Sequence, residues 1–122
     1  MNAAAQRLDA TFLALADPTR RAILVRLARG EASVNELMEP FALSQPAISK
    51  HLKVLERAGL VSAFQDGQRR PRRMHAEPLR EATAWIERYR EICEMSFGRL
   101  DGLLEELQQA TPKQRKARKR GE

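Results

Sequence analysis

The stretch that decides the predicted fold is LSQPAISKHLKVLERAGLV, residues 43–61. Ser44 can cap a helix through its hydroxyl, and Pro46 fits the first turn, where its missing N–H removes no hydrogen bond. Apolar residues then recur at the spacing of one helical face, at Ile48, Leu52 and Leu55. Gly59 suits the end of such a helix because glycine tolerates the left-handed conformation. The stretch therefore predicts an amphipathic helix over residues 45–58.

Three further helices are predicted on the amino-terminal side of this one. The first covers about residues 4–16. The second begins at Asp17-Pro18, an N-cap followed by a first-turn proline, and runs to about Arg29. The third opens at Ser33 and Glu36, whose spacing is that of a capping box. The apolar stripes of these helices are formed by Leu8, Phe12, Leu15, Ile23, Leu24, Leu27, Val34, Leu37, Met38 and Phe41.

A β-hairpin is predicted directly after the helix over residues 45–58. The first strand covers about residues 60–65, and Asp66-Gly67 is a strong hairpin signal. The return strand covers about residues 69–76. Because Pro71 has no backbone N–H to donate, we expect this strand at a sheet edge.

A long last helix is predicted from Pro78 to about Ala110. Its apolar residues alternate steps of three and four, as in a heptad seam: Leu79, Ala82, Ile86, Tyr89, Cys93, Ser96, Leu100, Leu103 and Leu107. A second stripe, of Trp85, Ile92 and Leu104, lies beside the seam. A helix that is apolar on two faces needs two packing partners, of which one is its own domain and the other, most simply, a second copy of the chain. We also expect Met38, Phe41, Trp85 and Phe97 to be core residues.

The predicted fold class is therefore mostly α with a small β-hairpin: a winged helix-turn-helix with a long carboxy-terminal dimerisation helix. A length of 122 residues is enough for one core and not for two. We expect one domain over residues 1–109 and a basic, disordered tail over residues 110–122.

Composition and charge narrow the class of protein further. The net charge is +6, and the residues from 113 to 120 supply six of the basic side chains. Such a tail suits a polyanionic partner or serves only as a soluble end. The single cysteine excludes an internal disulfide, and the longest apolar runs are far shorter than a membrane span. These features predict a cytoplasmic protein with no membrane partner.

The polar face of the helix over residues 45–58 has the chemistry of base recognition. The major groove of DNA admits one α-helix, and the second helix of a helix-turn-helix lies there. Gln45, Pro46, Ser49 and Lys50 occupy the amino-terminal half, which meets base edges. Lys53 and Arg57 lie further along, where they would contact phosphates.

The hairpin adds a second basic surface. Arg69, Arg70, Arg72 and Arg73 surround its tip, and arginine is favoured in the minor groove and at the DNA backbone. Alternatively, these are solvated charges on an exposed turn.

Three blocks carry a family resemblance: ALADPTRRAILVRLARG, the stretch quoted first, and DGQRRPRRMH at the hairpin. In this order and spacing they resemble the ArsR family of winged-helix repressors, over about residues 8–107. The resemblance implies a homodimer paired through its first and last helices. It also implies binding to a palindromic double-stranded operator and release by a signal. The implied interface residues are Leu8, Phe12, Leu79, Ile86, Tyr89, Cys93, Leu100 and Leu103.

The sequence departs from the metal-sensing members of that family. Residues 36–40 hold no cysteine pair, and the last helix holds no histidine. Transition-metal sites need several nitrogen or sulfur ligands, so we expect no metal and no cofactor. His51 is expected to be half-buried and to brace its helix or touch a phosphate. Cys93 is expected to be an inert seam residue, with an oxidation switch between two chains as the alternative.

Two other classes of function compete with operator binding. One is a winged-helix module that binds protein and uses its tail for non-specific polyanion contact, although such a module does not need four wing arginines. The other is an enzyme. We find no nucleophile–base pair, no phosphate-binding glycine loop and no acid pair, so the sequence predicts a protein that is not an enzyme.

Overall fold

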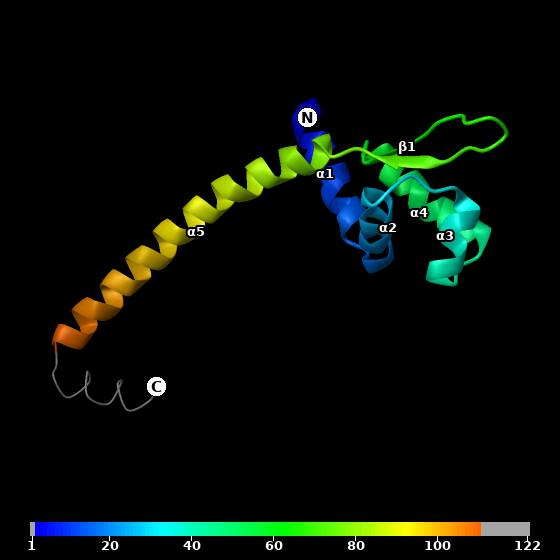
Figure 1. Cartoon of the computed structure of the whole chain (residues 1–122). Helices are drawn as coiled ribbons and strands as arrows, with labels where there is room; N and C mark the ends of the chain where they lie inside the picture. Colours follow the sequence, from blue (N-terminus) through cyan, green and yellow to red (C-terminus); the bar gives the residue numbers. More distant parts are fainter. Residues whose placement is uncertain (1, 111–122) are drawn as a thin grey trace. The chain divides into compact units, whose positions relative to one another are not determined.

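The structure is a computed structural model that describes residues 2–110, so the predicted tail lies outside the described residues apart from Ala110. The described residues form two compact units, which divide between Ala84 and Trp85. The elements in chain order are α1 (Ala3–Leu15), α2 (Pro18–Ala28), α3 (Val34–Phe41), α4 (Gln45–Arg57), β1 (Val61–Ala63), β2 (Arg72–Met74) and α5 (Glu77–Ala110) (Figure 1).

The helix starts follow from local capping chemistry. Asp17 accepts a hydrogen bond from the backbone N–H of Arg20, and Ser44 accepts one from that of Ala47. At the start of α3 both hydrogen bonds of the capping box are present: the Ser33 hydroxyl accepts from the Glu36 N–H, and the Glu36 carboxylate from the Ser33 N–H. Helices α2, α3 and α4 therefore begin within about one residue of their predicted starts, since caps satisfy N–H groups that have no partner inside the helix.

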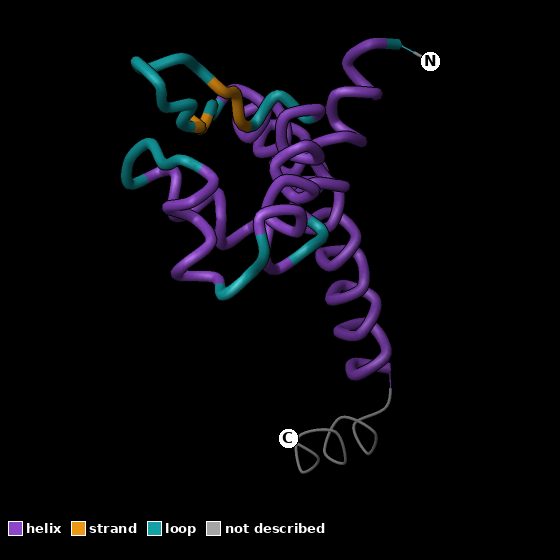
Figure 2. The backbone as a smooth tube through the Cα atoms, turned by 90° about the vertical axis from the view of Figure 1, so that its right-hand side faces the viewer, coloured by secondary structure: helices purple, strands orange, loops and turns teal. Residues whose placement is uncertain are grey.

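The core of the unit before Trp85 is aliphatic. Helices α1, α2 and α4 contact one another, α3 packs on α4, and the hairpin contacts α2 and α4. Figure 2 shows the short strands in orange beside the helices in purple. Met38 and Phe41 are partly buried against this core, as predicted. The fully buried large side chains are Ile23, Leu37, Ile48, Leu52, Leu55, Leu60 and the polar Thr11.

The hairpin differs from its prediction, because both strands are shorter. β1 and β2 pair antiparallel with Val61 opposite Met74 and Ala63 opposite Arg72. Beyond this ladder Pro71 can only accept, so Phe64 donates to its carbonyl at 3.1 Å and receives nothing in return. The turn residues are Gly67 and Gln68, one position later than predicted, and Gly67 has a φ of +64°. Glycine adopts that value without strain.

The return strand lies at a sheet edge, as predicted, because β1 and β2 form a two-stranded sheet, but a single bridge adds to it. The backbone of Arg72 pairs on its second side with Ala32, through hydrogen bonds of 2.7 and 3.2 Å. The edge at this point is therefore occupied by the segment between α2 and α3, and Pro71 is buried.

The unit that begins at Trp85 consists of the rest of α5 as far as the structure describes it. Its apolar residues are largely exposed, including Trp85 at 39% and Phe97 at 64%. The prediction that these two residues are core residues is therefore wrong for a single chain. Trp85 stacks on Tyr89 with ring centroids 5.4 Å apart.

Candidate nucleic-acid interface

Helix α4 presents the predicted base-reading face outward. Its apolar face is fixed inward because Ile48, Leu52 and Leu55 are 0–1% exposed. Ser49 is half-buried. The remaining predicted contact residues of α4 are all exposed: Gln45, Pro46, Lys50, Lys53 and Arg57.

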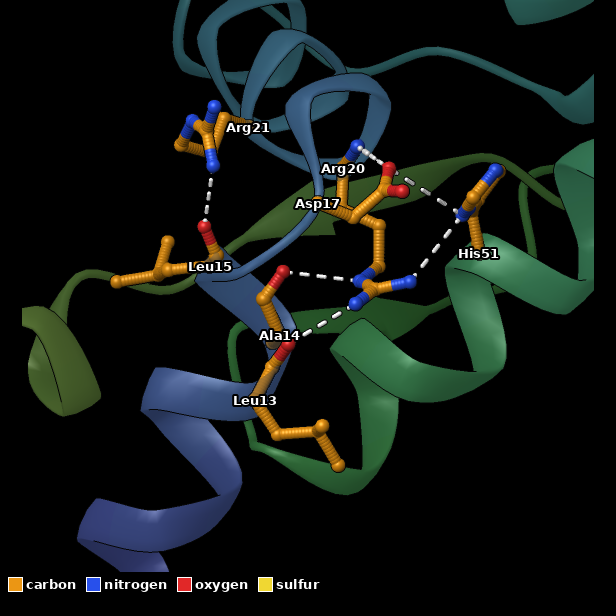
Figure 3. Close-up of polar contacts among 7 residues, drawn as sticks. All are labelled: Leu13, Ala14, Leu15, Asp17, Arg20, Arg21 and His51. Carbon is orange, nitrogen blue, oxygen red and sulfur yellow. Dashed lines mark hydrogen bonds and ion pairs between the residues drawn. The ribbon is translucent and has the colours of Figure 1, made fainter.

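Arg20 connects the inner side of α4 to the junction of α1 and α2 (Figure 3). The Arg20 guanidinium donates to the carbonyl oxygens of Leu13 and Ala14, both at 2.9 Å, and lies 3.5 Å from Nδ1 of His51 on α4. His51 is half-buried, and its Nδ1 also lies 3.9 Å from the Asp17 carboxylate. His51 therefore braces α4 from the protein side, which is the first of the two roles predicted for it.

Asp17 carries the negative charge of this junction. The backbone N–H of Arg20 is the largest cause that lowers the pKa of Asp17, and the charges of His51 and Arg20 add to the effect. Asp17 is thus ionised at neutral pH, where a negative charge at the start of α2 is favourable.

The wing, which we define as residues 64–73, carries its arginines mostly in ion pairs. Arg69 pairs with Glu36 at the start of α3, and Arg73 pairs with Glu31 at 2.9 Å and lies 4.2 Å from the ring centre of Phe64. Arg70 is exposed, and among the described residues no ion-pair partner of its side chain is present.

Arg72 takes a position that differs from the wing surface expected for it. Its side chain is only 16% exposed, pairs with Glu56 of α4 at 3.2 Å, and donates to the Arg70 carbonyl at 2.7 Å. We therefore assign Arg72 a role in holding the wing against α4. Its predicted contact with DNA stays an untested prediction.

A polar groove of about 460 Å³ joins the two predicted surfaces. Its lining comes from the start of α3, the start of α4 and the wing: Ser33, Val34, Asn35, Gln45, Ser49, Gln68, Arg69, Arg70 and Arg72. Sequence reasoning missed Asn35 and Gln68. Gln68 could have been found from the sequence, because it follows a turn glycine and precedes Arg69, a predicted contact. Asn35 lies inside the capping box of α3, away in the sequence from the predicted contacts, so no local signal indicated it.

The predicted dimer residues fall into both units. In the first unit, Leu8 and Phe12 are half-buried, and Leu79 packs partly against the core of its own chain. In the second unit Cys93 is half-buried, and the other four are about half exposed: Ile86, Tyr89, Leu100 and Leu103.

Within residues 2–110, no group of three or more His, Cys, Asp or Glu side chains is arranged to hold a metal ion. No helix in the same range is long and apolar enough to cross a membrane.

Two short helices, an outward polar face on the second, and a basic hairpin define a winged helix-turn-helix. Similarities to known proteins support this assignment to the winged helix-turn-helix class. Residues 17–63 match the bacterial regulatory proteins of the arsR family. The transcriptional regulator Rv2034 of Mycobacterium tuberculosis is 52% identical over 62 residues, which are 51% of this chain and 58% of that protein. The transcriptional repressor SdpR of Bacillus subtilis is 33% identical over 65% of this chain and 88% of its own length.

Solved structures extend the agreement to the three-dimensional fold. The ArsR family transcriptional regulator RHA00566 is 40% identical with a TM-score of 0.67, over 73% of this chain and 92% of that one. The homodimeric winged helix-turn-helix DNA-binding domain of Mb0332 from Mycobacterium bovis is 26% identical with a TM-score of 0.57, over 71% of this chain and 82% of that one. The chain belongs to the ArsR family of bacterial regulatory proteins.

Proposed function

We propose that this protein is a homodimeric repressor that binds a palindromic DNA operator through α4 and the wing and is released by a signal. The observation that carries the proposal is the outward polar face of α4, which continues through the groove into the wing. The similarity to SdpR, named as a transcriptional repressor, supports repression. Covering a promoter is the simplest mechanism that these surfaces provide.

Base recognition is assigned to the first half of α4. Glutamine pairs with adenine through two hydrogen bonds, lysine with guanine, and serine with several bases. Gln45, Ser49 and Lys50 supply these groups, and Pro46 offers an apolar contact beside them. These four residues would choose the operator sequence.

Phosphate contacts are assigned to the rest of the surface. Lys53 and Arg57 continue along the exposed side of α4, while Arg69 and Arg70 lie on the wing. Contacts of this kind fix the register of the protein on the duplex without reading its sequence. They also release counterions, so binding would weaken steeply with salt.

Dimerisation is assigned to α1 and α5. The half-exposed leucines and aromatic residues of α5 form an apolar surface that is not covered within the described residues of its unit. Mb0332, whose domain is homodimeric, supports a second copy as the partner. A symmetric dimer would deliver two α4 helices to successive major grooves about 34 Å apart.

Several finer features complete the proposal. We place the protein in the bacterial cytoplasm, bound to the nucleoid when on DNA, and assign it no enzymatic activity. The effector is an unidentified signal and not a metal. A protein-binding winged helix is not favoured, because the matched family is one of regulatory proteins.

The assignment of base recognition is tested by Lys50→Ala. The side chain is exposed, so the variant should fold normally. We expect it to lose preference for the operator over a scrambled duplex by about tenfold or more, since a good base contact discriminates by about 1–3 kcal/mol. Gel shifts on a panel of duplexes measure this. Unchanged preference would contradict the assignment.

A further inference from the structure

The ion pair between Arg69 and Glu36 lies beside the groove that the proposed function assigns to DNA. Arg69 lines the groove, whereas Glu36 does not and reaches Arg69 from the first turn of α3. Both side chains remain about half exposed, at 57% and 44%. The guanidinium is therefore accessible to a phosphate, but a carboxylate already occupies one of its donors.

The Glu36 carboxylate is held in this place by the backbone. One of its oxygens, Oε1, accepts hydrogen bonds both from the N–H of Ser33, at 3.2 Å, and from the Arg69 guanidinium. These contacts, of which the N–H of Ser33 is the largest cause, hold the pKa of Glu36 below its ordinary value. The group is therefore anionic at neutral pH and cannot swing away without opening the capping box.

We propose that Glu36 is a specificity-determining residue that withholds Arg69 from DNA until a backbone phosphate of the operator replaces its carboxylate. The inference rests on the proposed function and adds a competition to it. Arginine binds carboxylate and phosphate with the same fork of donors, so one anion must leave before the other binds. On a poorly fitting duplex the phosphate does not reach Arg69, and the internal pair persists.

The consequence is weaker binding to non-specific DNA. Electrostatic contacts with phosphates supply essentially all of non-specific affinity, and each neutralised phosphate steepens the salt dependence. An arginine that is paired with a carboxylate of its own chain contributes neither to non-specific affinity nor to the salt dependence. The ratio of operator binding to non-specific binding is thereby raised at no cost in base contacts.

The test is Glu36→Gln, which removes the charge but keeps the group that a capping box needs, since glutamine also serves at that position. The matched control is Glu31→Gln. It makes the same change of charge in the pair between Glu31 and Arg73, and neither of those residues lines the groove. Binding to a random-sequence duplex is measured by fluorescence anisotropy over a range of salt concentrations.

We expect Glu36→Gln to bind the random duplex about two- to fivefold more tightly than the control does, the range of one exposed ion pair. Its slope of log affinity against log salt should steepen by about one, for one more phosphate contact. The gain should vanish in an Arg69→Ala background. Equal gains in the two glutamine variants, no gain, or a gain that survives Arg69→Ala would overturn the proposal. Wild-type protein that binds no duplex even at low salt would overturn the proposed function itself.

Discussion

At the scale of single residues, Arg20 connects more of the fold than its neighbours do. It ends α1 by donating to two carbonyl oxygens of the last turn, and it contacts His51 on α4. Last-turn carbonyls have no partner inside a helix, so a guanidinium that satisfies two of them stabilises the helix end. The orientation of the proposed reading helix thus depends on a residue that does not itself lie on the DNA surface.

The variant Arg20→Ala should lower the free energy of unfolding by about 1.5–3 kcal/mol, the usual range for lost hydrogen bonds to a charged group. Arg21→Ala is the matched control, because Arg21 is exposed and donates to one carbonyl, that of Leu15, at 2.7 Å. Its cost should be about 0.5 kcal/mol or less, as for an ordinary surface substitution. Urea denaturation of both variants measures the difference, and equal costs would contradict the role given to Arg20.

At the scale of elements, the sequence predicted helices better than strands for a physical reason. Caps such as Ser33 and Ser44 act on backbone groups three residues away, so helix starts can be predicted from local sequence. The length of a strand depends on its partner strand. The pairing of Arg72 with Ala32 joins residues forty positions apart, and no local pattern announces it.

The same limit applies to the candidate site. The outward face of α4 could be predicted from the spacing of Ile48, Leu52 and Leu55, which fixes the opposite side as well. The ion pairing of the wing arginines could not be predicted in this way. Three of its four arginines pair with acidic residues of other segments, and such long-range pairs leave no periodic signal in the sequence.

The proposed dimer interface on α5 can be tested by substitutions on its apolar face. Leu100 and Leu103 are about half exposed on the apolar face, and charges placed there would be costly to bury in an interface. We expect wild-type protein to sediment as a dimer at micromolar concentration and the double variant Leu100→Glu, Leu103→Glu to sediment as a monomer. The control pair Asp101→Ala, Glu105→Ala lies on the polar face and should leave the dimer intact. A wild-type monomer would contradict the proposed interface. So would a double glutamate variant that still sediments as a dimer.

At the scale of the whole molecule, operator binding depends on two copies of one basic surface. The net charge of +6 favours association with DNA, but charge alone gives no preference for sequence. Preference comes from the few exposed side chains of α4, and symmetry doubles the number of bases that they read. A palindromic site is the signature that separates this arrangement from a basic protein that binds any polyanion.

Selection of bound duplexes from random DNA shows whether two copies of the protein read a symmetric site. We expect the protein to enrich one palindromic sequence, with half-sites about 10–10.5 base pairs apart from centre to centre. Enrichment of no sequence, or of a single half-site without symmetry, would contradict the claim that two α4 helices read DNA as a pair.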